Sequence, residues 1–204
     1  MIKTLIFDFG NVFINLDIEG AKNHALKQFD IEDLSEEMLG FNSFYEQGLI
    51  STNEFLEFFS DNFPHISKDQ LVDIWNYMLK DFPKYRLEFL QNLKKEKKYK
   101  LILLSNTNEL HINWIKKNVP FYNDFKNCFD AFYLSHEINL SKPSADIFEF
   151  VLNENNLEAS ECLFIDDNKD NIISAKDLKI KTWHIKPFED DIINLFKTNS
   201  GLFD

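Results

Sequence analysis

Arginine and cysteine are scarce in this chain of 204 residues, and each scarcity excludes a kind of site. Arg86 is the only arginine, so any recognition of phosphate must come from lysine, a metal ion or backbone amides. The two cysteines, Cys128 and Cys162, do not have the spacing of a metal motif and are too few for a disulfide framework. We therefore expect both thiols to pack in the interior of a protein from a reducing compartment.

Long apolar runs and an excess of positive charge are also absent. No run approaches the roughly 20 apolar residues that a membrane span needs, and no charged-then-apolar leader is present. The net charge is −12, which argues against nucleic acid and anionic membranes as partners. A local metal site is still compatible with a small phosphorylated ligand. We expect a cytoplasmic protein with no nucleic-acid or membrane partner, and the sequence does not indicate its oligomeric state.

Short apolar runs are spread along the chain, whose residues are 44% hydrophobic. Helical patterns lie between most of these runs, for example at 87–95, 147–152 and 172–178. Strands that alternate with helices predict an α/β fold with a parallel, Rossmann-like sheet that is covered on both faces. Ligands of such sheets bind beyond the carboxyl ends of the strands. The expected strands are 4–7, 100–104, 131–134, 162–165 and 182–185.

The long stretch between the first two expected strands breaks this alternation, because it contains helical patterns alone. In YEQGLISTNEFLEFF, Gly48 is placed to end one helix, and Ser51 with Glu54 forms a capping box for the next. We expect 16–84 to be a helical cap that is inserted into a core. An insert that leaves the first strand must emerge near the functional edge of the sheet, which favours a cap over a structural appendage. The core would comprise 1–15 and 85–204.

Polar side chains follow several of the expected strands. The opening stretch MIKTLIFDFGNVF places an aspartate after the first strand, LILLSNTN places a serine and an asparagine after the second, and LFIDDNKDN places two aspartates after the fourth. A lysine lies in the loop LSKPSADIF. Because the carboxyl ends of parallel strands meet at one edge, we expect these side chains to lie together. They are Asp8, Ser105, Asn106, Lys142, Asp166 and Asp167.

This set of side chains is suited to phosphoryl transfer. Carboxylates at one place repel each other unless a cation lies among them, and oxygen ligands at an open face suit Mg²⁺ with a substrate phosphate. With a metal ion, Lys142 and Ser105 on the phosphate, Asp8 can attack phosphorus to form an aspartyl-phosphate that water hydrolyses. Each residue also has a simpler explanation: the aspartates could form turns, Ser105 could cap a turn, and Lys142 could be a solvated loop lysine. Their order along the chain favours the shared site.

The stretches FDFGNVF, LLSNT, SKPSADIF and FIDDNKDN resemble the four motifs of the haloacid dehalogenase-like (HAD) hydrolase superfamily, in the family order and over nearly the whole chain. The insert resembles the helical cap that follows the first motif. Within the superfamily the motifs are most similar to phosphatases of sugar phosphates, the subgroup that includes alpha-D-glucose-1-phosphate phosphatase. The resemblance implies that Ser105 and Asn106 hold the phosphoryl group or its surroundings and that Lys142 neutralises charge on Asp8 and the phosphate.

The same resemblance implies a Mg²⁺-dependent phosphatase of a small phosphorylated metabolite. Asp8 would be the nucleophile and a ligand of Mg²⁺, and the backbone carbonyl of Gly10 would be a second ligand. Asp167 would bind the metal ion directly, with Asp166 binding directly or through water.

Gly10 departs from the pattern of the superfamily, in which most phosphatases carry an aspartate at this position. That aspartate protonates the leaving oxygen and then deprotonates the attacking water, and such catalysis is typically worth about 10²–10⁴-fold. The substrate could have a good leaving group, such as an anomeric or acyl phosphate. Another residue could supply the proton, with Asp17, His24 and Glu46 as candidates. The third explanation is a weakly active or non-catalytic regulatory protein that binds phosphate and metal.

A haloacid dehalogenase is a further alternative from the same superfamily. That reaction attacks carbon and needs no metal ion, so its fourth motif does not need paired aspartates. The pair in FIDD therefore argues against it.

Overall fold

The computed structural model describes residues 1–203 and contains a five-stranded parallel sheet with the strand order β3-β2-β1-β4-β5. In the central pairs, Phe7 of β1 lies level with Leu103 of β2 and Ile165 of β4. The residues that follow these three positions therefore share one edge of the sheet. The expected α/β class is confirmed. The strands are β1 (Thr4–Phe7), β2 (Lys100–Ser105), β3 (Ala131–Leu134), β4 (Cys162–Asp166) and β5 (Lys181–His184).

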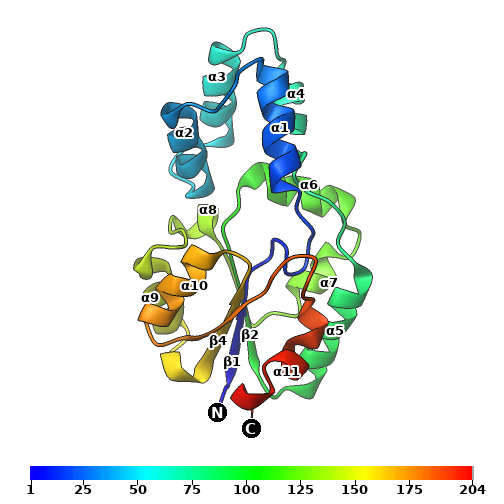
Figure 1. Ribbon diagram of the computed structural model, residues 1–204, viewed down its shortest axis with the longest axis vertical. Helices are drawn as coiled ribbons and strands as arrows, with labels where there is room; N and C mark the ends of the chain where they lie inside the picture. Colours follow the sequence, from blue (N-terminus) through cyan, green and yellow to red (C-terminus); the bar gives the residue numbers. More distant parts are fainter. Residues whose placement is uncertain (204) are drawn as a thin grey trace.

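The strands are almost continuously apolar because helices cover both faces of the sheet. Leu5, Phe7 and Leu103 lie on one face, which packs against α5, α6 and α7. Ile6 and Phe164 lie on the other face, against α9 and α10. Figure 1 shows α9 and α10 on one side of the sheet and α5, α7 and α11 on the other. These helices are α5 (Lys84–Glu96), α6 (Glu109–Asn118), α7 (Tyr122–Lys126), α9 (Ala145–Glu154), α10 (Lys169–Asp177) and α11 (Leu195–Thr198).

Three strands differ slightly from the expected bounds. β2 and β4 each continue for one more residue, because Ser105 pairs with Leu134 and Asp166 pairs with His184 in the sheet. Ser105 and Asp166 are thus the last residues of strands rather than the first residues of loops. β5 begins and ends one residue earlier than expected, at Lys181 and His184. The three expected helices lie within or close to α5, α9 and α10.

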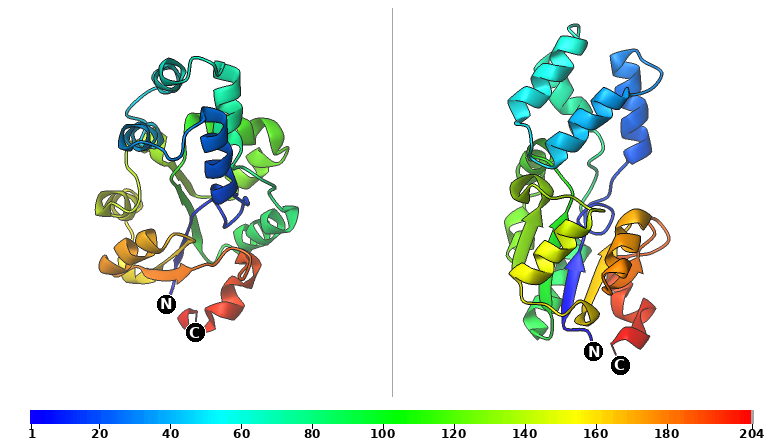
Figure 2. Two further views of the ribbon diagram at one scale, coloured as in Figure 1. Left: turned by 45° about the horizontal axis from the view of Figure 1, so that its top comes forward. Right: turned by 90° about the vertical axis from the view of Figure 1, so that its left-hand side faces the viewer.

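The insert after β1 contains helices that pack around an aromatic cluster of their own. Phe29, Tyr45, Phe55 and Phe59 are almost fully buried in this cluster, and Leu110 of α6 joins it from the core. Figures 1 and 2 show the bundle standing on the end of the core where the strands end. The insert helices are α1 (Ile18–Phe29), α2 (Glu36–Glu46), α3 (Thr52–Asn62) and α4 (Lys68–Asn76).

The connection between α2 and α3 has the features expected from its sequence. Ser51 and Glu54 form a capping box at the start of α3. Gly48 has a φ of +67° just beyond α2, and a Cβ at this position would lie 2.1 Å from the carbonyl oxygen of His136. Glycine is therefore required both for the left-handed backbone and for the contact with α8 (Ser135–Ile138).

Two neighbouring segments join the insert to the core. Leu16 pairs with Leu79 in an isolated antiparallel bridge, and the Asn15 N–H donates to the Asp81 carbonyl at 2.9 Å. The Arg86 guanidinium donates to the Phe13 carbonyl at 3.1 Å and to Asn15 Oδ1 at 2.9 Å. The only arginine of the chain thus stabilises the loop after β1 rather than a phosphate. The expected boundaries of the insert, 16 and 84, stay a prediction.

The remaining described segments complete the core. Cys128 and Cys162 are both buried free thiols. No helix within residues 1–203 is long and apolar enough to cross a bilayer. Short 3-10 turns are found at Ala159–Glu161, Ile192–Asn194 and Ser200–Leu202.

Candidate active site

A buried lysine lies between two aspartates at the carboxyl edge of the sheet. Lys142 Nζ is 2.7 Å from Asp8 Oδ1 and 2.7 Å from Asp166 Oδ2, and it also donates to the Leu104 carbonyl at 2.9 Å. The Lys142 side chain is 1% exposed. A buried ammonium is stable only when it is paired and hydrogen-bonded, as it is here. The explanation of Lys142 as a solvated loop lysine is therefore wrong.

Asn106 holds the loop that carries this lysine. The Lys142 N–H donates to Asn106 Oδ1 at 3.0 Å, and Asn106 Nδ2 donates to the Lys142 carbonyl at 2.8 Å. Both ends of the Asn106 amide are engaged by the backbone of one residue. Asn106 thus positions Lys142, while its contact with a substrate stays a prediction.

The acidic residues form a cluster around this lysine. Carboxylate oxygens of Asp8, Asp166 and Asp167 all lie within 4.8 Å of one another. Asp8 is 8% exposed and Asp166 is fully buried. The Asp8 N–H donates to the Ile165 carbonyl at 2.9 Å, which fixes the start of the loop after β1 against β4.

The oxygens of this cluster differ in how they are used. Asp166 Oδ1 accepts from the Asn168 N–H at 2.7 Å, and Asp166 Oδ2 accepts from Lys142 and from Asn171 Nδ2 at 3.0 Å. Asp167 Oδ2 accepts from Asn11 Nδ2 at 2.8 Å. Among the residues that the structure describes, Asp8 Oδ2 and Asp167 Oδ1 accept no hydrogen bond. These two oxygens are free to bind a metal ion, and the group that could hold one also includes an oxygen of Asp166.

Three asparagines hold the aspartates of the cluster, and the sequence motifs alone did not indicate this role. Asn11 lies in the left-handed region with φ 53°, holds Asp167 through Nδ2 and accepts from the Leu16 N–H through Oδ1 at 2.9 Å. Asparagine tolerates this backbone conformation better than most residues, so the asparagine in FGNV is itself an indication of a turn at this position. Asn168 and Asn171 lie within FIDDNKDN, but their bonds to Asp166 depend on how α10 begins.

The side chains of the site carry more negative than positive charge. Burial raises the pKa of Asp8 to about 7, against the opposing effect of Lys142, and the neighbouring aspartates raise it further. Burial also raises the pKa of Asp167. Burial opposes the charge of Lys142, but the two aspartates outweigh it, so the pKa of Lys142 is raised. The cluster thus lacks positive charge, and its free carboxylate oxygens fit a divalent cation with hard-oxygen preference such as Mg²⁺.

Gly10 lies near Asp8, and a side chain at this position would press on the end of the Leu16 side chain. A Cβ at Gly10 would be 2.6 Å from Leu16 Cδ1 and 3.7 Å from Asp8 Oδ2. Gly48 is the glycine with a positive φ, so the backbone of Gly10 does not itself require glycine. Leu16 therefore occupies the space that a larger residue at position 10 would need. The role of the Gly10 carbonyl as a metal ligand stays a prediction.

A cavity of about 70 Å³ lies beside Gly10, between the core and the insert. Gly10, Ser105 and Asn106 line it from the core, and Glu46 and Met78 line it from the side of the insert. The hydroxyl of Ser105 makes only a long contact of 3.4 Å with the Asn106 carbonyl oxygen, and Ser105 is 3% exposed. This hydroxyl is therefore able to donate to an oxygen of a bound group.

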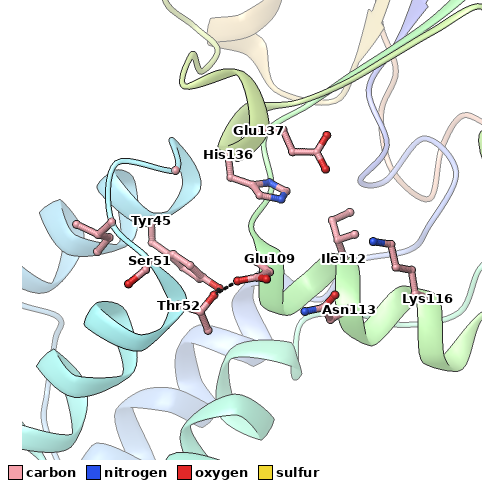
Figure 3. A pocket seen from close by; sticks show the side chains of 11 residues that line it. Tyr45, Ser51, Thr52, Glu109, Ile112, Asn113, Lys116, His136 and Glu137 are labelled. Atoms are coloured by element: carbon pink, nitrogen blue, oxygen red, sulfur yellow. Dashed lines mark hydrogen bonds between the residues drawn. The ribbon is translucent and has the colours of Figure 1, made fainter.

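A second cavity, of about 320 Å³, lies on another part of the boundary between insert and core. Figure 3 shows Tyr45 and Thr52 on the insert side facing Glu109 and His136 on the core side. Tyr45 and Thr52 share a hydrogen bond of 2.8 Å, and Thr52 also contacts Glu109. None of the predicted site residues lines this cavity, whose walls come from both the insert and the core.

Comparison with known proteins identifies relatives that cover most of the chain. Residues 2–179 match the model of the haloacid dehalogenase-like hydrolase family. D-ribitol-5-phosphate phosphatase from Bacteroides thetaiotaomicron is 28% identical over 195 residues, which is 90% of this chain and 91% of that protein.

Solved structures of HAD proteins are also similar to this chain. A HAD family enzyme from Bacteroides thetaiotaomicron in its magnesium complex is 35% identical, with a TM-score of 0.82 over 93% of this chain and 96% of that one. A predicted HAD-like hydrolase from Porphyromonas gingivalis is 27% identical, with a TM-score of 0.85 over 97% of this chain and 98% of that one. The matched family model spans the motifs around Asp8, Ser105, Lys142 and Asp167. The chain therefore belongs to the haloacid dehalogenase-like hydrolase family.

Proposed function

We propose that this protein is a Mg²⁺-dependent phosphatase that hydrolyses a small phosphorylated metabolite, a polyol or sugar phosphate, through an aspartyl-phosphate. The observation that carries this proposal is the contact of Asp8 with the buried Lys142, beside Asp166 and Asp167. Magnesium complexes of a relative that is 35% identical support the choice of metal ion. We also retain the cytoplasmic location and the absence of nucleic-acid and membrane partners as predictions.

Each part of the site has a task in this reaction. A bound Mg²⁺ would be held by the free oxygens of Asp8 and Asp167 and would supply positive charge toward the phosphate. Asp8 attacks phosphorus, while Lys142 favours the ionised form of the Asp8 carboxylate and attracts the phosphate. Ser105 donates its hydroxyl hydrogen to a phosphate oxygen. Water then cleaves the aspartyl-phosphate and regenerates Asp8.

A relative and the cavity support the proposed substrate class. The curated relative that is 28% identical acts, by its name, on D-ribitol-5-phosphate. The cavity at Ser105 continues toward α2 and the segment around Met78, so the insert would contact the part of the substrate that leaves. We accordingly propose that the insert, at 16–84, is a cap that selects the substrate.

The test is phosphate release with Mg²⁺ from a panel of polyol phosphates, sugar phosphates, acyl phosphates, nucleotides and an aryl phosphate. We expect release from polyol or sugar phosphates by the wild type, and a loss of at least about 10³-fold in kcat for Asp8→Asn, because no other group can accept the phosphoryl group. Far-ultraviolet circular dichroism of the variant checks that it is folded. Comparable activity of Asp8→Asn would remove Asp8 from the role of nucleophile.

The alternatives give different results in the same assay. If Mg²⁺ binds and no phosphate ester is hydrolysed, the protein is a non-catalytic member that binds phosphate and metal. Chloride release from 2-chloropropionate without Mg²⁺ would instead support a haloacid dehalogenase.

A further inference from the structure

Glu46 of the insert lines the cavity at Gly10 and Ser105, although neither metal binding nor nucleophilic attack requires it. It is the last residue of α2, and its carbonyl accepts from Ser135 Oγ at 2.5 Å, which ties the end of the helix to the core. Among residues 1–203, its carboxylate has one long hydrogen-bond contact, at 3.4 Å from Asn42 Nδ2. A partly buried carboxylate with so little engagement is available to a molecule in the cavity.

His111 is the other titratable residue that lines this cavity, and its proton is already used. His111 Nδ1 lies 3.2 Å from Asn108 Nδ2, which can only donate, so Nδ1 is the acceptor. His111 Nε2 then carries the ring proton and donates to the Trp75 carbonyl at 3.0 Å. Burial lowers the pKa of His111 to about 4, so the ring is neutral near pH 7 and has no further proton to give.

The other candidates named from the sequence are engaged elsewhere. Asp17 caps α1 by accepting from the Gly20 N–H at 2.9 Å, and it lies 3.6 Å from Lys80 Nζ. The ring of His24 stacks on Tyr77 with 4.2 Å between ring centroids. Neither residue lines the cavity at Ser105.

We propose that Glu46 is the general acid and base of the phosphatase, in place of a side chain at Gly10; this role rests on the proposed function. As an oxygen of Asp8 bonds to phosphorus, the ester P–O bond breaks and its electron pair stays on the leaving oxygen, which takes a proton from Glu46. The Glu46 carboxylate then takes a proton from water as the water oxygen bonds to phosphorus. The P–O bond to Asp8 breaks with its electron pair returning to Asp8. The sum is ester plus water giving alcohol plus phosphate.

The surroundings of Glu46 suit this exchange. Burial raises the pKa of the Glu46 carboxyl, with the Asn42 hydrogen bond opposing, which brings it closer to the operating pH that acid–base catalysis favours. The charged or titratable residues that share its adjoining recess of about 270 Å³ are Lys22 on α1 and His111 on α6. Lys22 is paired with Asp33 at 3.0 Å, so Glu46 is not held ionised by a close lysine partner.

The experiment compares Glu46→Gln with a control, Glu37→Gln, which alters an exposed glutamate of the same helix. The substrates are the best alkyl phosphate of the panel, D-ribitol 5-phosphate in the first instance, and p-nitrophenyl phosphate. We expect Glu46→Gln to lower kcat on the alkyl phosphate by about 10²–10⁴-fold, because an alkoxide needs a proton to leave. First-turnover release of p-nitrophenolate, which leaves without a proton, should fall by less than about tenfold. The alkaline limb of the wild-type pH profile should disappear in the variant.

Several results would overturn this role. Equal losses on both substrates would make Glu46 a binding or structural residue, and an unchanged rate on the alkyl phosphate would exclude it. If Glu46→Gln does not fold, Glu46→Asp is the variant to measure, and it should have a lower kcat and retain the alkaline limb of the pH profile. Loss of the alkaline limb in Glu46→Asp would count against the proposal. A wild type that is inactive on every phosphate would instead refute the proposed function, and with it the role of Glu46.

Discussion

Asp166 and Asp167 are neighbours in the chain, but their carboxylates have different surroundings. Asp166 is fully buried, and both of its oxygens accept hydrogen bonds within the protein. Asp167 is partly exposed and keeps one oxygen free among the described residues. Asp166 is therefore suited to hold Lys142, and Asp167 to bind a metal ion.

This difference predicts opposite effects of two matched substitutions. Asp167→Asn should weaken Mg²⁺ binding by at least about tenfold and change the free energy of unfolding of the metal-free protein by less than about 1 kcal/mol. Asp166→Asn should lower that free energy by about 3–5 kcal/mol, because it removes one partner of a buried ion pair. Isothermal titration calorimetry with Mg²⁺ and urea unfolding in EDTA measure the two quantities. The assignment is wrong if Asp166→Asn weakens Mg²⁺ binding without loss of stability.

Gly10 shows how a neighbour determines what a position can hold. The obstacle to a side chain at position 10 is Leu16 Cδ1, and Leu16 belongs to the segment that pairs with Leu79. A side chain at position 10 would require the end of the Leu16 side chain to shift, and Leu16 lies in the connection between insert and core. The missing acid at this position is thus linked to the packing of the insert, which is consistent with an acid supplied by the insert itself.

The end of α2 carries Glu46 and also makes the contact with α8. Asn139 Nδ2 donates to the carbonyls of Gln47 and Gly48 at 3.0 and 3.1 Å, next to the bond between Ser135 and Glu46. These bonds hold the insert against the core at the cavity. The position of α2 therefore depends on the turn at Gly48.

Two glycines of this region should respond in opposite ways to alanine. Gly48→Ala should lower the free energy of unfolding by more than about 1 kcal/mol, because φ is +67° and the Cβ would meet the His136 carbonyl oxygen. Gly40→Ala, within α2 and with nothing within 4 Å of its Cβ, should raise it by about 0.5–1 kcal/mol. Urea unfolding of both variants beside the wild type is the measurement. A stabilising effect of Gly48→Ala would mean that the turn is not held against α8.

At the scale of the whole molecule, insert and core have separate apolar clusters that meet at α6. Leu110 belongs to the aromatic cluster of the insert, while Ile112 and Ile115 of the same helix belong to the core. His111 lies between them and connects α6 to the end of α4 through the Trp75 carbonyl. Protonation of this buried ring therefore affects the contact between the two halves.

The stability of the protein should depend on pH through His111. Its pKa is about 4 in the folded protein and 6.5 as its ordinary value, so the unfolded chain binds the proton first as the pH falls. The stability that the neutral His111 ring contributes is fully present above pH 6.5 and is lost as the pH falls toward 4. The free energy of unfolding should therefore fall by about 2 kcal/mol between pH 7 and pH 5 through this residue.

Comparison with His111→Gln isolates this effect, because glutamine retains a donor and does not titrate. The difference in the free energy of unfolding between wild type and variant should shrink by about 2 kcal/mol from pH 7 to pH 5. The opposite trend of Asp8 is common to both proteins: its raised pKa of about 7 favours the fold at low pH and is lost as the pH rises through 7. A difference that does not change with pH would show that the His111 ring is protonated equally in both states.

The strands, the capping box at Ser51 and the helical nature of the insert could all be predicted from the sequence, because each is encoded by neighbouring residues. The apolar runs and the helical spacing report which residues face a core, and the aspartates at the strand ends follow from the direction of parallel strands. The site residues Asp8, Ser105, Lys142 and Asp167 could also be predicted from the sequence. Three of them lie at or just after the end of an apolar strand, and Lys142 lies in a motif loop.

Only the tertiary structure decided how these residues are used. The Lys142–Asp8 pair spans 134 positions of the chain, and the Asn11–Asp167 bond spans 156, so no local pattern reports either contact. The same holds for Glu46 of the insert, which lines a cavity together with Ser105 of the core. Burial, free oxygens and raised pKa values arise from atoms that are distant in sequence and adjacent in space, which is the reason that they follow from the fold and not from the motifs.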